Sequence, residues 1–160
     1  MELEDLERRV AALEARLDAG ATGTEPTEGD FWVLDGLKKR SSDGAVLFAG
    51  AIEGERGPLS FQWTRPIDFF AEDDWTAHAA TLAALGHPAR LALLRRLFDG
   101  PATAAELAEQ ADLSSVGVVY HHLNQLTAAG WVRALGGGRH GLNPQRAVAL
   151  LAVLLATEGA

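Results

Sequence analysis

The order of short elements within residues 103–142 constrains the fold more than any other feature of this chain. The stretch TAAELAEQA opens with a capping box, in which Thr103 caps a helix and Glu106 follows three residues later. After a tight break, SSVGVVYHHLNQLTAA predicts a second helix, capped by Ser114 or Ser115. WVRALGGGRHGL then predicts two short strands joined by a glycine turn. Two short helices and a small hairpin must therefore share one core.

Helical signals continue on both sides of this run. EDDWTAHAATLAAL predicts a helix that begins near Glu72 and ends at Gly86. Pro88 suits the first position of the next helix, which contains ARLALLRRLF. NPQRAVALLAVLLATEG predicts a last helix that Asn143 caps and that is apolar on almost every side. Such a helix needs cover on more than one face, and a second subunit is the natural cover for so short a chain.

Residues 82–142 resemble the ArsR-type winged helix-turn-helix regulators at three separate places. LGHPARLALLRRL is similar to the opening helix of that family, TAAELAEQADLS to its first helix and turn, and VYHHLNQLTAAGWV to its recognition helix. The resemblance implies a repressor that binds double-stranded DNA as a homodimer, with terminal helices forming the dimer. Its two recognition helices would meet half-sites about one DNA turn apart.

The expected recognition helix has two distinct faces at about 100° per residue. The inward face holds Val116, Val119, His122, Leu123 and Leu126. The outward face holds Gly117, Tyr120, His121, Asn124 and Gln125, with Val118 on its flank. Two of the three early valines are therefore expected in the core. The polar outward side chains can bond base edges or phosphates.

The candidate DNA contacts lie at the start of this helix, on its outward face and in the wing, which is the predicted hairpin of residues 131–142. They are Ser114, Ser115, Gly117, Tyr120, His121, Asn124, Gln125, Arg133, Arg139 and His140. Free N–H groups at a helix start can hold a phosphate, and wing arginines can contact phosphates or the minor groove. Two alternatives stay open: Gly117 can serve local packing, and Arg139 can be a solvated surface residue.

The charge distribution opposes strong nonspecific binding to DNA. The net charge is −8, divided as −4 in residues 1–40, −5 in residues 41–77 and +1 in residues 78–160. No arginine or lysine lies between Asp99 and Arg133. Acidic appendages lower the affinity for phosphates. We therefore expect modest affinity, with specificity drawn from thymine methyl groups and DNA shape.

The N-terminal region adds three segments. In residues 1–19, apolar side chains recur at heptad spacing, which predicts a coiled-coil dimerisation helix; a helix packed on its own domain is the alternative. Residues 20–30 have a linker composition. In residues 31–71, a short helix capped by Asp30 is expected to end at Arg40, and AVLFAGAI and LSFQWTRP predict a β-hairpin with one buried face. The candidate dimerisation residues are Leu3, Leu6, Val10, Leu13 and Leu17, together with Val148, Leu151 and Leu155 of the last helix.

Aromatic side chains are dense in and beside this hairpin segment. The candidates for an effector pocket are Trp32, Phe48, Phe61, Trp63 and Trp75. Such a density can line a site for a small molecule. The alternative is a small core plus a dimer surface. The sequence does not identify the effector, which can be a small molecule or a protein.

Other function classes lack support in the sequence. Cysteine is absent, so disulfides and thiolate metal sites are excluded. His121 and His122 are adjacent and diverge by about 100° on a helix, so they do not easily share a metal ion. We find no nucleophile motif, phosphate loop or carboxylate pair, and we expect no enzyme, no cofactor and no metal. The longest apolar run, 147–156, is too short to span a bilayer, and with no signal-peptide pattern we expect a cytoplasmic protein without a membrane partner.

Together these observations predict a mainly α fold with a small β part (α+β). It is a winged helix-turn-helix (residues 72–142) with an N-terminal coiled-coil helix, an inserted β-hairpin segment and a C-terminal dimerisation helix (143–160). The leading function is a homodimeric, sequence-specific DNA-binding transcription regulator with a non-metal or unknown signal. The alternatives are a protein-interaction module on a winged-helix scaffold with weak or no DNA binding, and a ligand-binding storage or sensing protein.

Overall fold

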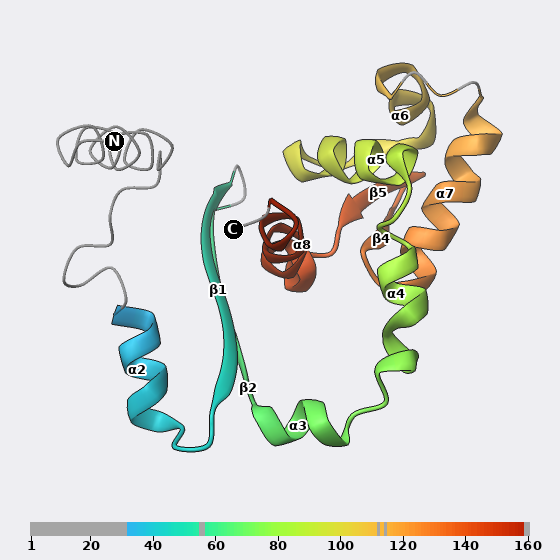
Figure 1. Cartoon of the computed structure of the whole chain (residues 1–160). Coiled ribbons are helices and arrows are strands. Elements are labelled where there is room, and N and C mark those ends of the chain that lie inside the picture. The colour runs from blue at the N-terminus through green and yellow to red at the C-terminus, as the bar shows by residue number, and fades with distance from the viewer. Residues whose placement is uncertain (1–31, 55–56, 112, 114, 159–160) are drawn as a thin grey trace, which may run out of the picture. The chain divides into compact units, whose positions relative to one another are not determined.

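Helix α7 (Val116–Ala128) lies at the centre of the best-buried region of the chain, as seen in a computed structural model (Figure 1). The structure describes residues 32–54, 57–111, 113 and 115–158. The chain divides into two compact units, Met1–Ser42 and Asp43–Ala160. Several predictions made above lie outside the described residues: the coiled coil with Leu3, Leu6, Val10, Leu13 and Leu17, the linker 20–30, the Asp30 cap and Ser114.

The described part of the first unit is helix α2 (Trp32–Arg40), which ends at the predicted residue. Asp35 lies in its first turn, and its last turn carries Lys38, Lys39 and Arg40. This order of charges matches the helix dipole, positive at the start and negative at the end. None of its side chains is buried, and Trp32 is exposed.

The second unit begins with the predicted β-hairpin. Strands β1 (Ala45–Gly54) and β2 (Gly57–Pro66) pair antiparallel, with Phe48 opposite Trp63. Leu59 and Phe61 are half-buried while Ser60 between them is exposed, so the predicted alternation holds for these residues. Trp63 was expected on the same buried face but is 44% exposed. Its ring stacks on the Phe61 ring and lies under the Arg65 guanidinium, and Arg65 is a polar side chain that does not need to be shielded from solvent.

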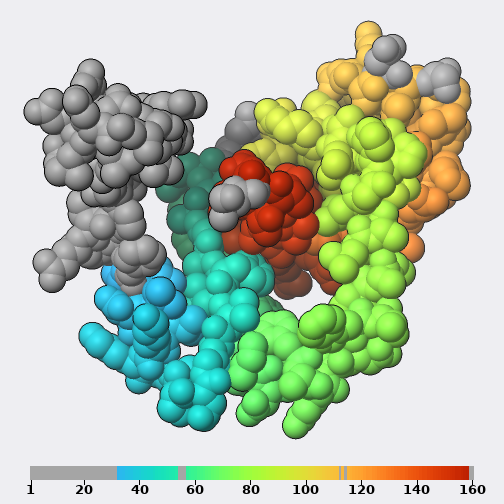
Figure 2. Space-filling view, viewed as in Figure 1, coloured from blue at the N-terminus to red at the C-terminus, as the bar shows by residue number. Residues whose placement is uncertain are grey.

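The hairpin packs on helix α8 (Pro144–Ala156) of the same unit (Figures 1 and 2). The two backbones approach closely at Gly50, where a Cβ atom would lie 2.7 Å from Cγ1 of Val148. Only glycine leaves room for this approach, because contacts below about 3 Å do not occur between real carbon atoms. A single glycine of β1 therefore lets the hairpin lie flat on α8.

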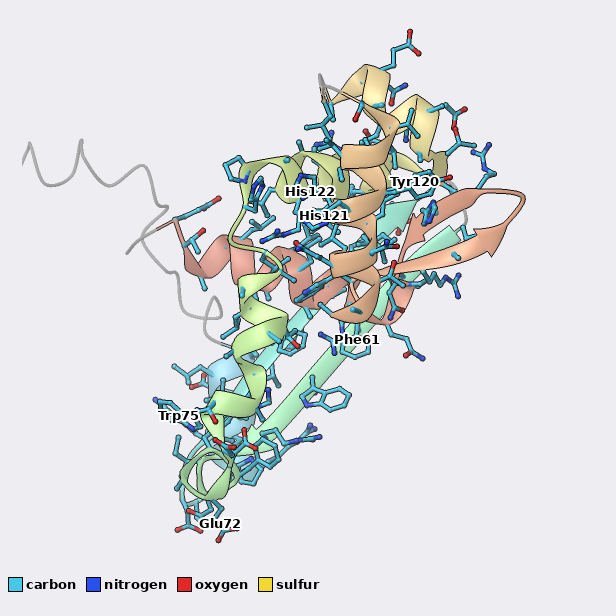
Figure 3. All side chains as sticks on the ribbon, turned by 90° about the vertical axis from the view of Figure 1, so that its right-hand side faces the viewer. Phe61, Glu72, Trp75, Tyr120, His121 and His122 are labelled. Atoms are coloured by element: carbon cyan, nitrogen blue, oxygen red, sulfur yellow. The ribbon has the colours of Figure 1, made fainter. Side chains whose placement is uncertain are left out.

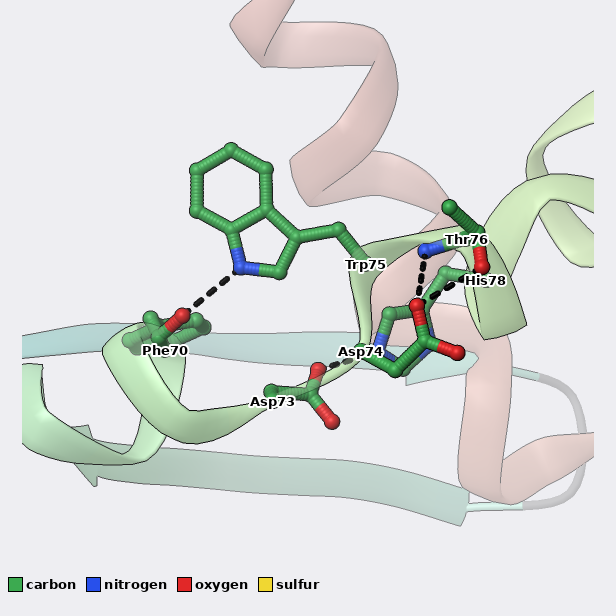
Figure 4. A network of polar contacts seen from close by, with 6 residues as sticks. All are labelled: Phe70, Asp73, Asp74, Trp75, Thr76 and His78. Carbon is green, nitrogen blue, oxygen red and sulfur yellow. Dashed lines mark hydrogen bonds and ion pairs between the residues drawn. The ribbon is translucent and has the colours of Figure 1, made fainter.

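The helix predicted from Glu72 to Gly86 is wrong in its first half. Helix α3 (Ile67–Glu72) ends where it was expected to begin, and it is followed by a 3₁₀ turn η1 (Trp75–His78) and helix α4 (Ala79–Ala83). The Asp74 carboxylate accepts hydrogen bonds from the Thr76 N–H at 3.0 Å and the Thr76 hydroxyl at 2.7 Å (Figure 4). Asp73 contacts His78 Nε2 at 2.5 Å. These side-chain bonds compete with helical backbone bonds and favour a turn.

Next come the elements of the helix-turn-helix. They are helices α5 (Pro88–Asp99), α6 (Ala104–Gln110) and α7, and a sheet of strands β3 (Ala102–Thr103), β5 (Arg139–Leu142) and β4 (Val132–Gly136) in that order. The capping box of Thr103 and Glu106 and the first-turn position of Pro88 are confirmed. The largest fully buried side chains are Leu93, Leu94, Leu107, Val119, Leu123 and Leu126. The result is a mixed fold of helices and small strands, winged-helix-like as predicted.

Helix α8 closes the described chain. Asn143 caps it by accepting a hydrogen bond from the Gln145 N–H at 3.2 Å, and Pro144 occupies its first turn, both as predicted. Ala147, Val148 and Leu150 are buried. Within the described residues, no helix combines the length and the apolar character needed to cross a membrane.

Candidate nucleic-acid interface

Helix α7 begins at a capped N-terminus. Ser115 has extended backbone angles (φ −166°, ψ 157°), and its side-chain oxygen accepts a hydrogen bond from the Val118 N–H at 3.3 Å. Of the two serines predicted to cap this helix, Ser115 is therefore confirmed as the cap. The other N–H groups of the first turn have no partner within the helix and carry its positive partial charge.

The two predicted faces of α7 are confirmed along most of its length (Figure 3). The buried residues are Val119, His122, Leu123 and Leu126. The exposed residues of the opposite face are Gly117, Tyr120, His121, Asn124 and Gln125. One face of the helix therefore seals the core, and the other presents polar groups outside it.

The prediction that two early valines are core residues is wrong for Val116. Its side chain is 42% exposed, Val118 is 36% exposed, and only Val119 is fully buried. Val116 is the first residue of the helix, and helical side chains lean toward the helix N-terminus. Its side chain therefore extends past the end of the core, and the start of α7 presents two apolar groups beside its cap.

A cation that the sequence analysis missed lies against the outward face of α7. Arg90 Nη1 donates to Gln125 Oε1 at 2.5 Å, and Gln125 Nε2 lies 3.1 Å from His121 Nε2. Arg90 also donates to the carbonyls of Ala83 and Ala84, at 2.8 and 2.5 Å. The only sequence signal was an arginine two residues after Pro88 on a helix otherwise expected to pack. Arg90 therefore links the end of α4 to two candidate base-reading side chains.

Three histidine rings meet behind this face. The His122 ring centroid lies 4.8 Å from that of His87 and 5.5 Å from that of His121. His122 is buried, and its Nδ1 has no hydrogen-bond partner among the described residues. Burial lowers the pKa of His122, and His87, His121 and Arg90 lower it further by charge repulsion. Among the described residues, no group of three His, Asp or Glu side chains is arranged to hold a metal ion.

The wing follows α7 as predicted. Gly136, Gly137 and Gly138 have φ values of 85°, 59° and 72°, and they connect β4 to β5. Glycine adopts this left-handed region without steric cost, so the three residues suit a tight hairpin turn. Arg133 and Arg139 are exposed on the two strands.

Contacts tie the wing to its neighbours. Arg139 Nη2 donates a hydrogen bond to the carbonyl of Pro101, in the loop before β3. The Tyr120 and His140 rings lie 6.2 Å apart at 73°, an edge-on contact between α7 and β5. Hydrogen bonds from Thr103 lower the pKa of Glu106, and the charge of Arg139 contributes. Arg139 therefore carries both an internal hydrogen bond and a nearby carboxylate.

Within the second unit, three of the candidate effector residues lie together. The rings of Phe48, Phe61 and Trp63 stack in a row, with centroids 6.0 and 5.9 Å apart. Trp75 is 70% exposed, and its indole donates to the Phe70 carbonyl at 2.7 Å (Figure 4). Trp32 belongs to the other unit of the chain. The structure thus brings together three of the five residues.

The candidate dimerisation residues of α8 lie on different sides of the helix. Val148 is buried against β1 of the same chain. Leu151 and Leu154 are 38% and 40% exposed, and Leu155 is 67% exposed. The exposed leucines leave an apolar surface on the last two turns of the helix.

The sequence comparison identifies the part of the chain that carries this geometry. Residues 85–133 match the family model of a helix-turn-helix domain. The match runs from the residues just before α5 to the first residues of β4. No curated protein and no solved structure matches the chain. The chain therefore contains a helix-turn-helix domain at residues 85–133, with α7 as its second helix.

Proposed function

We propose that this chain is a sequence-specific DNA-binding transcription regulator of the ArsR type that acts as a homodimer. The observation that carries the proposal is the outward face of α7, which exposes polar side chains beside a wing while its inward face is sealed in the core. Any surface helix has a polar outer face, so the position of this row beside the wing is what favours DNA reading. A helix-turn-helix domain is itself suggestive of a DNA-binding regulator.

Each candidate residue receives a role from its position. Tyr120, His121, Asn124 and Gln125 read base edges in the major groove. The N–H groups at the capped start of α7 bind a phosphate, together with Ser114 and Ser115. Arg133, Arg139 and His140 contact the backbone or the minor groove from the wing.

Gly117 supports close contact between the α7 backbone and DNA. A Cβ atom at this position would meet only Ser115 Oγ, at an ordinary 3.8 Å. Packing within the chain therefore does not require glycine here, although glycine costs a helix about 1 kcal/mol relative to alanine. Contacts within the described chain therefore give no reason for glycine here, which favours approach to a phosphate backbone.

The exposed leucines of α8 support the homodimer part of the proposal. Leu151, Leu154 and Leu155 are 38%, 40% and 67% exposed and give the last turns of α8 an apolar surface. A second copy of the chain would cover it and would place two α7 helices on one duplex. Exposed apolar surfaces of this kind mark protein interaction sites.

The test is selection of bound sequences from a random duplex pool by the purified full-length chain at roughly 100 mM salt. We expect a palindromic sequence whose affinity falls as salt rises. A recovered site without a palindrome would contradict the dimeric part of the proposal. A pool with no enrichment, even at low salt, would contradict DNA reading altogether.

A protein-interaction module is the second candidate, and one specific observation favours it. The start of α7 exposes Val116 and Val118 and carries no arginine or lysine, which suits an apolar protein partner better than phosphates. The variant Val118→Ser separates the two functions. It should leave duplex selection intact if α7 reads DNA, and it should abolish capture of a protein partner if the valines form the contact.

A further inference from the structure

A cavity of about 540 Å³ lies within the second unit, away from the outward face of α7. Its lining comes from the turn end of the hairpin strands β1 and β2, from the end of α5 and the loop before β3, and from β5 and the start of α8. Figure 1 shows these elements close together. Cavities of this size hold small organic molecules.

The cavity lining has a clear chemical character. Ile52, Leu59 and Phe98 supply apolar wall, and Phe98 is 38% exposed. Among the described residues, which leave out the hairpin turn 55–56, the charged side chains in the lining are Glu53 and Asp99, and no lysine, arginine or histidine is present. An occupant with an apolar body and a positive charge therefore matches both parts of the wall, whereas an anion would meet two carboxylates.

The two carboxylates differ in how far they are already neutralised. Asp99 Oδ1 accepts a hydrogen bond from Arg95 Nη1 at 2.6 Å, in an exposed ion pair one helical turn apart. For Glu53, the structure records no ion pair among the described residues. Glu53 is therefore the main partner for a cationic group, and Asp99 adds a weaker field.

The cavity also touches the backbone that holds the wing. Its lining includes Gly100 and Pro101, and the Pro101 carbonyl accepts the hydrogen bond from Arg139. The next residues pair with β5, with Ala102 opposite His140. At Gly141, also in the lining, a Cβ atom would lie 2.8 Å from the Leu135 side chain of the wing, so this region is tightly packed. An occupant that shifts this loop therefore shifts the wing.

We infer that this cavity is an effector site for a small apolar molecule with a protonated amine, held by Glu53 and coupled through the Pro101 loop to the wing. The coupling to DNA rests on the proposed function, but the binding itself does not. Because coupling is reciprocal, an amine that changes the affinity for DNA must bind with an affinity that DNA changes by the same factor.

The test uses two probes of the same shape and opposite charge, 2-(1-naphthyl)ethylamine and 1-naphthylacetate. Calorimetric titration of the full chain without DNA should give saturable binding of the amine, with a Kd of roughly 0.1 mM, and much weaker binding of the acetate. Glu53→Gln should weaken amine binding roughly three- to tenfold, because one partly solvated charge pair is lost. Glu72→Gln removes an exposed carboxylate of α3 outside the cavity and should change nothing.

Three results would overturn the inference: no saturable amine binding, equal binding of the two probes, or equal effects of Glu53→Gln and Glu72→Gln. A second titration adds the selected duplex, whose affinity the amine should change in the wild type and not in Glu53→Gln. A chain that binds the amine but selects no duplex contradicts the proposed function alone. A chain that selects a duplex but does not bind the amine contradicts only the cavity assignment.

Discussion

The helix-turn-helix region and the hairpin region of the second unit differ sharply in burial. From Ala84 onward the core contains seven side chains of less than 2% exposure. Within the described residues from Ala45 to Ala83, by contrast, no side chain is buried, and Val46, Trp75 and Leu82 are more than half exposed. An apolar surface of this extent suggests a binding partner. The comparison indicates that the first region carries its own stability, whereas the second depends on what packs against it.

The largest effect is expected from truncating matched leucines in the two regions. Leu123→Ala removes a side chain with 0% exposure and should lower the free energy of unfolding by about 2–5 kcal/mol, because it leaves a cavity. Leu47→Ala, at a half-buried position of β1, should cost less than half as much. Urea unfolding monitored by circular dichroism measures both. Equal losses would contradict the difference in stability between the regions.

The second largest loss of unfolding free energy is expected at the contact between Gly50 of the hairpin and Val148 of α8. Gly50→Ala places a methyl group 2.7 Å from Val148 and should lower the free energy of unfolding by about 1–3 kcal/mol, because hairpin and α8 must move apart. Gly36→Ala is the matched control, since nothing lies within 4 Å of the added Cβ in helix α2. The control should be neutral or slightly stabilising. If Gly50→Ala were equally neutral, the hairpin would not rest on α8 at this glycine.

Matched arginine substitutions test whether DNA binding is confined to one region. Arg139→Ala in the wing should weaken binding to every duplex by about 1 kcal/mol and reduce the salt slope by about one, because a phosphate contact is lost. Arg65→Ala in the hairpin, which removes a cation stacked on Trp63, should leave both unchanged. Fluorescence anisotropy across a salt series measures both quantities.

His121→Ala tests whether the recognition helix α7 reads bases. It should erode discrimination between operator and random duplex rather than overall affinity, because it removes a candidate base contact. An equal loss on every duplex would instead assign His121 to the backbone.

The smallest expected effect is a pH dependence at His122. The pKa of His122 is lowered from 6.5 in the folded chain, mainly by burial. Below about pH 6.5 the unfolded chain takes up this proton first, so the stability that is present above that pH is lost as the pH falls. His122→Leu should flatten the fall in unfolding free energy between about pH 7.5 and 5.5. Asn124→Leu places the same side chain on the exposed face and should retain the wild-type slope.

Local signals explain why most helix and strand boundaries could be predicted. The capping box at Thr103, the cap at Asn143 and the glycine turn of the wing act within a few residues, so their effect is visible in the sequence. The same holds for the alternation of Leu59 and Phe61. The prediction failed at Asp73 and Asp74, two acids that suit a helix start. Asp73 instead contacts His78, and Asp74 accepts hydrogen bonds from Thr76, so the segment forms a turn.

The periodicity of α7 determined which of its side chains face the core, because a helix repeats every 3.6 residues wherever it lies. It could not determine where the core ends, and so it misplaced Val116. It also could not bring Arg90 to Gln125, 35 residues away, or bury Val148 against Gly50. The sequence by itself determined the helix-turn-helix region and its two-faced helix, since these depend on neighbours in the chain. Only the tertiary structure decided the arginine link and the cavity at the wing, because both arise from contacts between segments distant in sequence.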